Sequence, residues 1–184
     1  MSEQNNKYGK YPKNALIEDV AKDFLDSEKM KNLLDFLEFL KNNKFTPQRG
    51  SSAKWAVKYK GKPICHLRLI VEDKGGGWSP TLTNCTIKDW RITHNHFTRD
   101  WFVNCEKYFA DEEMKKFIWN HIQAPGCRPE CGSSKTILGR EFNRVCTCEP
   151  FGNTSPSGVE LEYSKKLILI IKAYIADLAA AIKA

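Results

Sequence analysis

The chain has 184 residues, of which 41% are hydrophobic and 28% are charged, as in an ordinary globular domain with its own core. Eleven glycines and eight prolines are too few for a low-complexity or collagen-like chain. The longest apolar run, Leu167–Ile171, is too short to span a bilayer, and the first 14 residues contain no apolar run typical of a signal peptide. We therefore expect a cytoplasmic protein without a membrane partner, whose seven cysteines are reduced thiols or metal ligands.

The net charge of +7 is concentrated in one part of the chain. Residues 41–74 contain nine Lys or Arg and two acidic residues, a local excess of +7, so the remainder of the chain sums to zero. A local basic excess indicates an anionic partner such as nucleic acid or a phosphate-bearing ligand, or else a solvated basic face.

Two helices are predicted near the N-terminus. Asn14 can cap a short helix in which Leu16, Val20 and Phe24 recur at intervals of four. A longer amphipathic helix is predicted over residues 28–42, beginning near Ser27. Its predicted apolar stripe consists of Met30, Leu33, Leu34, Leu37 and Leu40, broadened by Phe36 and Phe39. We interpret residues 1–26 as an N-terminal arm with a short helix and residues 27–184 as a single domain.

A β-hairpin is predicted next. Trp55, Val57 and Tyr59 alternate with lysines, Gly61 marks a turn, and a second strand follows from Pro63. Pairing the two strands gives one apolar face and one basic face, which is a candidate surface for an anion or nucleic acid. The basic face consists of Lys54, Lys58, His66 and Arg68.

The middle of the chain is rich in aromatic residues, with strands predicted at residues 81–86 and 87–94. His94-x-His96 would place two imidazoles on one side of a strand, where a catalytic metal could be held with His66 or Asp100 as a third ligand. A polar loop without metal is the other interpretation of this motif. Cys105 near His94 would suggest a nucleophile and base, whereas Cys65, Cys85 and Cys105 also fit small buried residues.

Two further helices are predicted, over residues 111–122 with Asp111 as N-cap and over residues 158–183. The second is apolar nearly all round in its middle, which indicates either a central core helix or a homodimer interface.

Four cysteines fall in the segment 121–148, as Cys127-x3-Cys131 and Cys146-x-Cys148. Two thiol pairs separated by a polar hairpin are typical of a structural Zn²⁺ site with four soft ligands, and His121 is a candidate replacement for one sulfur. Unligated thiols, and redox or disulfide chemistry, are the alternative interpretations.

Three stretches of the sequence resemble a small bacterial α+β protein family with no assigned activity. They are FLKNNKFTPQ at residues 39–48, WAVKYKGKPICHLRL at 55–69 and LGREFNRVC at 138–146. The resemblance covers roughly residues 30–175 and implies a compact α+β domain. In that family the early cysteines lie closer together than Cys127 and Cys131.

The sequence therefore predicts an α+β fold, with an antiparallel sheet of about four to six strands packed against three or four helices. The leading functional hypothesis is a small non-enzymatic binding domain stabilised by a cysteine-ligated zinc. The alternatives are an enzyme that uses His94 and His96 or a reactive cysteine, and a nucleic-acid binder that uses the 54–68 hairpin. No nucleophile elbow, metalloprotease helix motif or dinucleotide fingerprint is present in the sequence.

Overall fold

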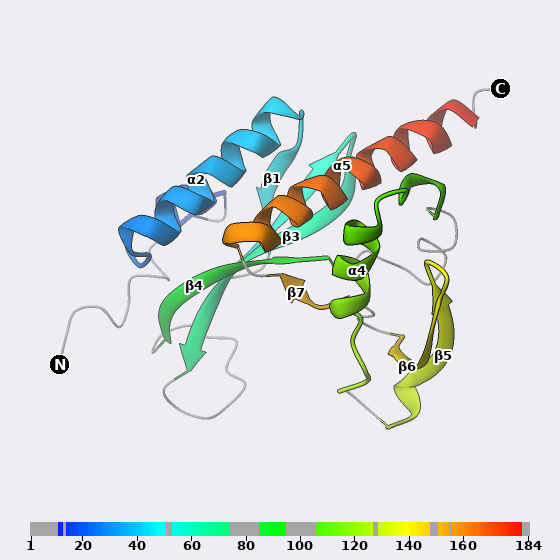
Figure 1. Ribbon diagram of the computed structural model, residues 1–184. Coiled ribbons are helices and arrows are strands. Elements are labelled where there is room, and N and C mark those ends of the chain that lie inside the picture. Colours follow the sequence, from blue (N-terminus) through cyan, green and yellow to red (C-terminus); the bar gives the residue numbers. More distant parts are fainter. Residues whose placement is uncertain are drawn as a thin grey trace. The chain divides into compact units, whose positions relative to one another are not determined.

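The computed structural model describes residues 11–12, 14–50, 53–73, 85–94, 106–126, 129–147, 151–154 and 156–181, and only the backbone of 71–73, 85–88 and 129. The chain forms two compact units, Met1–Ile92 and Thr93–Ala184. Helices combine with an antiparallel sheet (Figure 1), so the predicted α+β class is confirmed. The division of the chain at residue 26 stays a prediction.

The first unit contains two helices and four strands. The helices are α1 (Ile17–Ala21) and α2 (Ser27–Asn42), and the strands are β1 (Thr46–Arg49), β2 (Lys54–Tyr59), β3 (Lys62–Asp73) and β4 (Cys85–Thr93). Within this unit the sheet order is β1-β2-β3-β4, with β1 as an edge strand. The predicted hairpin is confirmed: β2 pairs antiparallel with β3, and Lys60 (φ 49°) and Gly61 (φ 78°) form the turn.

The core of the first unit lies between α2 and the sheet. Trp55 and Val57 of β2 are buried, as their alternation predicts. The ring of Phe36 lies 5.7 Å from that of Trp90 on β4, and the indole N–H of Trp90 donates to the Lys29 carbonyl. The predicted stripe of α2 needs one correction, because Leu34 is 46% exposed whereas Phe36 is fully buried. Phe36 is buried because its face of α2 packs against the sheet.

Helix α1 differs from its prediction. It begins at Ile17, with Leu16 rather than Asn14 as N-cap, and ends at Ala21. Ile17, Val20 and Ala21 are its buried residues, whereas Leu16 is 54% exposed. The buried stripe of α1 therefore consists of Ile17, Val20 and Ala21 and not of the predicted Leu16, Val20 and Phe24. The Trp55 indole donates a hydrogen bond to the Ala15 carbonyl, and this contact fixes the segment that precedes the helix.

The predicted strands 81–86 and 87–94 also need correction. The described part of this region forms one continuous strand, β4, from Cys85 to Thr93. Thr86 and Ile87 provide no turn residue at which the chain could break. Trp90, Ile92 and His94 are buried in this part of the chain, and so is Thr93. Residues 81–84 lie outside the described residues.

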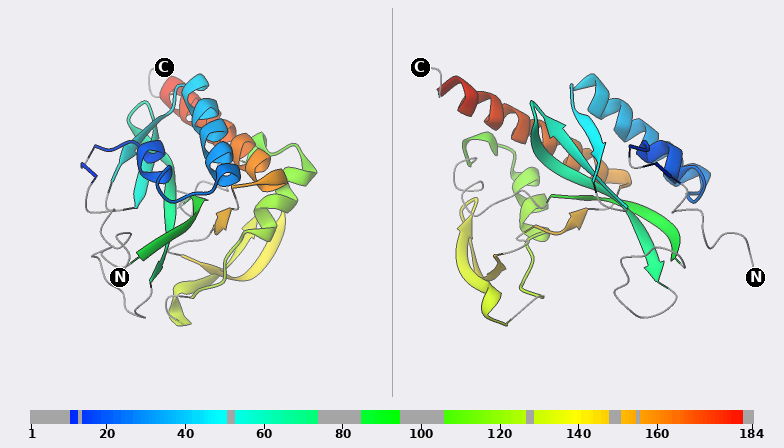
Figure 2. Two further views of the ribbon diagram at one scale, coloured as in Figure 1. Left: turned by 90° about the vertical axis from the view of Figure 1, so that its left-hand side faces the viewer. Right: turned by 180° about the vertical axis from the view of Figure 1, so that it is seen from behind.

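The second unit begins at Thr93, whose hydroxyl donates to the Asn153 side-chain oxygen at 2.8 Å. Asn153 belongs to the short strand β7 (Asn153–Thr154). Its other elements are η3 (Glu106–Tyr108), α4 (Glu112–Asn120), η4 (Pro129–Cys131), β5 (Gly132–Ile137), β6 (Arg140–Cys146) and α5 (Gly158–Ala181). Strands β5 and β6 form a separate two-stranded ribbon (Figure 2).

Both helices predicted for the second half are confirmed. Asp111 caps α4 by accepting from the Glu113 backbone N–H at 3.0 Å. Helix α5 buries Leu161, Leu167, Ile168, Ile171 and Ile175, while Leu169 and Leu178 remain exposed. Among the helices of the described residues, none combines the length and apolar character that a bilayer crossing demands. The homodimer stays a prediction.

Candidate ligand groove and cysteine hairpin

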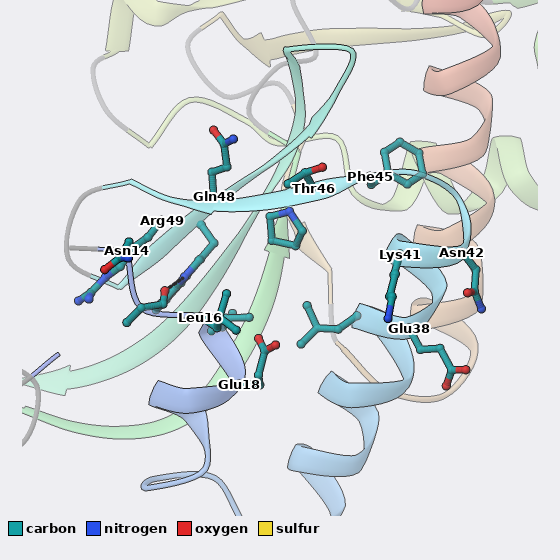
Figure 3. Close-up of a pocket in the computed structure, with 15 residues that line it drawn as sticks. Asn14, Leu16, Glu18, Glu38, Lys41, Asn42, Phe45, Thr46, Gln48 and Arg49 are labelled. Atoms are coloured by element: carbon teal, nitrogen blue, oxygen red, sulfur yellow. Dashed lines mark hydrogen bonds between the residues drawn. The ribbon is translucent and has the colours of Figure 1, made fainter. Parts of the chain in front are cut away.

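A cavity of about 760 Å³ lies in the first unit, between the start of α1, the C-terminal half of α2 and the edge strand β1. Figure 3 shows these segments around the open space, with Leu16 on the α1 side and Phe45 at the entry to β1. Its apolar lining is Ala15, Leu16, Ile17, Leu37, Phe45, Pro47 and Trp55. We call this cavity the groove.

Arg49 is one of the residues that line the groove. Its guanidinium donates to the backbone carbonyls of Tyr11 and Pro12 and lies 5.6 Å from the centroid of the Trp55 ring. Trp55 is 1% exposed and its indole N–H is satisfied by the Ala15 carbonyl at 3.0 Å. The backbone before α1 is thus attached to the sheet through side chains, which gives the groove a defined wall.

Polar and charged side chains form the remainder of the lining. They are Asn14, Glu18, Glu38, Lys41, Asn42, Thr46, Gln48 and Arg49. Glu18 is half-buried, and Figure 3 shows its carboxylate pointing from α1 toward β1, into the open space. Glu38 and Lys41 lie on exposed positions of α2. An apolar floor with a few polar groups is the usual composition of a small-molecule site.

The cysteine segment folds as the β5–β6 hairpin, with Leu138 (φ 50°) and Gly139 (φ 80°) at its turn. Cys131 and Cys146 lie at the open end, where Gly132 is paired with Cys146. Their Sγ atoms are 3.9 Å apart. A disulfide needs about 2.05 Å between sulfurs, so these two thiols are not joined. The second unit therefore brings together one cysteine from each predicted pair.

The sulfur separation fits one edge of a tetrahedral zinc site. Four thiolates at about 2.3 Å from one Zn²⁺ lie about 3.8 Å from each other. Cys127 and Cys148, the other members of the predicted set, lie outside the described residues. Among the residues that are described, no three His, Cys, Asp or Glu side chains form a metal-binding group. The zinc site therefore stays a prediction, of which the structure describes only Cys131 and Cys146.

The backbone around these thiols is well connected. The Cys131 carbonyl accepts from the Thr147 backbone N–H at 3.1 Å and from its hydroxyl at 2.7 Å. Because that hydroxyl proton is engaged, the 3.1 Å contact between Cys131 Sγ and Thr147 Oγ1 has the thiol as donor. The Cys146 N–H donates to the Gln123 carbonyl, which attaches the hairpin to the segment that follows α4.

His94 and His121 meet around the ring of Phe151. His94 is fully buried and packs edge-on to Phe151, with ring centroids 5.3 Å apart, while His121 stacks on Phe151 at 5.5 Å. Burial, with a smaller contribution from His121, lowers the pKa of His94 from 6.5 to about 3. His94 is therefore neutral at physiological pH.

His121 is the C-cap residue of α4. Its Nδ1–H donates to the Phe117 carbonyl at 2.8 Å, and Nε2 lies 3.7 Å from a Glu160 carboxylate oxygen. This arrangement resembles a packed, hydrogen-bonded histidine, and a role in replacing one sulfur stays a prediction. His96, Asp100 and Cys105, named with His94 as enzymatic candidates, lie outside the described residues.

The basic face of the hairpin is arranged as predicted, apart from a shift in register. Lys54 lies directly opposite Arg68, and Ala56 opposite His66. An irregularity between Val57 and Lys58 places Lys58 opposite Pro63. Arg68 is exposed and the other basic side chains are half-buried. Cys65, on the opposite face, is fully buried, and burial raises the pKa of its thiol, so it has no thiolate character.

Sequence reasoning missed the groove, because no linear motif encodes it. Its walls come from residues 14–18, 37–42, 45–49 and 55, and each segment reads by itself as ordinary core or surface. Comparisons with protein-family models, curated proteins and solved structures find no match to the chain.

Proposed function

We propose that this protein is a small non-enzymatic binding domain, whose ligand occupies the groove of the first unit and whose second unit is held together by a structural zinc. The observation that carries the binding role is the groove itself. Its volume of about 760 Å³ lies within the range of about 300–1,000 Å³ of known small-molecule sites. Leu16 supports this role further, because it lines the groove and yet is 54% exposed.

The proposed zinc ligands are Cys127, Cys131, Cys146 and Cys148. The 3.9 Å separation of the Cys131 and Cys146 sulfurs supports the proposal, since a bound ion needs little movement of either side chain. When bound, such an ion would supply folding energy and no chemistry, because four protein ligands leave no open coordination position. Reduced thiols of this kind fit the proposed cytoplasmic location.

The binding role is tested with naphthylmethanol, a neutral aromatic probe, titrated into the protein and followed by NMR. A ligand of this size is expected to bind with a Kd on the order of 0.1–1 mM. Leu16→Arg places a charged side chain in the groove and should weaken binding at least about tenfold. Leu34→Arg is the matched control, because Leu34 is similarly exposed, at 46%, but does not line the groove.

Equal affinities for both arginine variants would contradict this placement of the site. Absence of saturable binding to the unmodified protein would contradict the binding role.

The zinc is tested by elemental analysis of protein purified without chelators. We expect close to one Zn²⁺ per chain, and loss of most of it in Cys146→Ser. Cys65→Ala is the control, because Cys65 is also buried but belongs to the first unit. Zinc-free native protein, or equal zinc content in both variants, would remove the metal from the proposal.

Nucleic-acid binding through the basic face is the second candidate. It is favoured by the direct cross-strand pairing of Lys54 with Arg68, since two like charges opposite each other are stabilised when an anion lies between them. Arg68→Glu should then abolish retention on immobilised single-stranded DNA at low salt, and retention of the unmodified protein should fall steeply with added salt. Unchanged retention of Arg68→Glu would exclude this face.

A further inference from the structure

We infer that the groove selects ligands that carry a positive charge beside an apolar body, and that Glu18 recognises the charge. This inference rests on the proposed binding function and specifies its ligand class. It comes from the distribution of the four charged side chains that line the groove, Glu18, Glu38, Lys41 and Arg49. Their formal charges cancel, so position decides which charge a ligand meets.

Arg49 is already engaged. Its guanidinium donates to two backbone carbonyls and lies over the Trp55 ring, so it acts as a wall of the groove. Glu38 and Lys41 are three residues apart on exposed positions of α2, where opposite charges at this spacing offset each other and water screens both. Arg49 is thus occupied by protein contacts, and the charges of Glu38 and Lys41 are weakened by solvent for any ligand in the groove.

Glu18 is placed differently. It is half-buried on the first turn of α1, and its carboxylate points into the open space (Figure 3). Within the described part of the chain, no ion pair reaches this carboxylate. A partly buried carboxylate interacts more strongly with a ligand ammonium than a surface carboxylate does, because the surrounding dielectric is lower.

The apolar lining determines the rest of the ligand. Leu16, Leu37 and Pro47 line the same cavity as Glu18. When Glu18 binds the ammonium group of a ligand, the hydrocarbon part of that ligand would therefore contact these apolar side chains. A small inorganic cation would leave this surface in water and gain nothing from it. The arrangement therefore fits an organic amine with an aromatic or branched aliphatic body.

The test uses three probes with one ring system: naphthylmethylamine, naphthylmethanol and naphthoic acid, which are cationic, neutral and anionic near pH 7. Their Kd values are measured by NMR titration at fixed ionic strength. We expect the amine to bind about three- to tenfold more tightly than the alcohol, and the acid most weakly.

Glu18→Gln should reduce the preference for the amine to about twofold or less, since the amide keeps the shape and removes the charge. Asp19→Asn is the matched control. Asp19 is the next residue on α1, pairs with Lys22 at 3.3 Å and does not line the groove, so its loss should leave the preference unchanged.

The outcomes separate the two proposals. Equal binding of the three probes, preference for the acid, or equal effects of Glu18→Gln and Asp19→Asn would each overturn the role of Glu18 while the binding function stands. Absence of saturable binding by all three probes would overturn the binding function, and this inference with it.

Discussion

At the scale of single residues, burial determines the protonation state of His94 in the second unit. His94 is fully buried in an aromatic environment, and its neutral form is the one that packs against Phe151. Its sequence context, between Thr93 and Asn95, resembles an exposed loop or a metal motif. Only the folded chain, which brings Phe151 and His121 to the same place, shows the burial.

The first prediction is that His94 makes the stability of the protein depend on pH in the acidic range. Its pKa is lowered from 6.5 to about 3, so between these values the unfolded chain binds a proton that the folded chain does not. Stability should therefore fall as the pH decreases from about 6.5 toward 3, by up to about 1.4 kcal/mol per pH unit. Denaturant unfolding at several pH values across this range should show that the unfolding free energy changes less steeply with pH in His94→Gln than in the unmodified protein.

His66→Gln is the control for that measurement, because His66 lies on the half-buried basic face of the first unit. A slope for His94→Gln that equals that of the unmodified protein would show that His94 titrates normally.

At the scale of secondary structure, two hairpins use the same turn. Lys60–Gly61 and Leu138–Gly139 each have positive φ at both central residues, the geometry that matches the twist of the paired strands. The sequence indicated the first turn, because Gly61 lies between two alternating strands. It also indicated a polar hairpin between the two thiol pairs, but not where that hairpin turns, because Leu138 is a residue type that rarely adopts positive φ.

Gly139→Ala should destabilise the hairpin through its backbone alone. Gly139 has φ 80°, which alanine adopts at a cost, whereas an added Cβ would meet nothing within 4 Å. We expect about 1 kcal/mol lower unfolding free energy, measured by denaturant unfolding. Gly126→Ala is the matched control, since Gly126 has equal space and no positive φ. Equal effects of both substitutions would contradict the explanation.

Gly132 is needed for a different reason. A Cβ at Gly132 would lie 2.5 Å from Pro125 Cγ, part of a rigid ring in the segment that joins α4 to the cysteines. Gly132→Ala should therefore push the hairpin away from the segment that contains Pro125 and lower stability by about 1–3 kcal/mol in the same unfolding assay. A fully stable Gly132→Ala would show that this close approach is not required.

Local periodicity explains which elements the sequence could predict. The helices α2, α4 and α5 and the β2–β3 hairpin follow from repeats of apolar residues, which local spacing determines. Leu34 and Phe36 show the limit: both fit a broad apolar stripe, and only the position of the sheet decides that Phe36 is buried and Leu34 exposed. The groove could not be predicted from the sequence, because the segments that line it are far apart along the chain. They come together only through tertiary contacts, such as the hydrogen bond between the Trp55 indole and the Ala15 carbonyl.

At the scale of the whole molecule, the two proposed sites belong to different units. The groove is built from residues of the first unit, and the cysteine hairpin from residues of the second. Each unit also has its own buried aromatic residues, Trp55 and Trp90 in the first and Phe109 and Phe151 in the second. Ligand binding and zinc binding are therefore expected to stabilise different parts of the chain.

Hydrogen exchange tests this separation. A strong chelator should increase exchange of peptides that cover residues 131–146 and leave those of β1 and β2 unchanged. Naphthylmethanol should slow exchange at α1 and β1 with no effect on the hairpin. A uniform response of the whole chain to the chelator would contradict the assignment of the zinc to the second unit alone.

The central claim is that the groove is a ligand site, and chemical-shift mapping with naphthylmethanol tests it most directly. We predict saturable shifts confined to the groove lining, strongest at Leu16, Leu37, Phe45 and the Trp55 indole. Shifts centred on the basic face around Arg68, or the absence of saturable shifts at millimolar probe, would contradict the account.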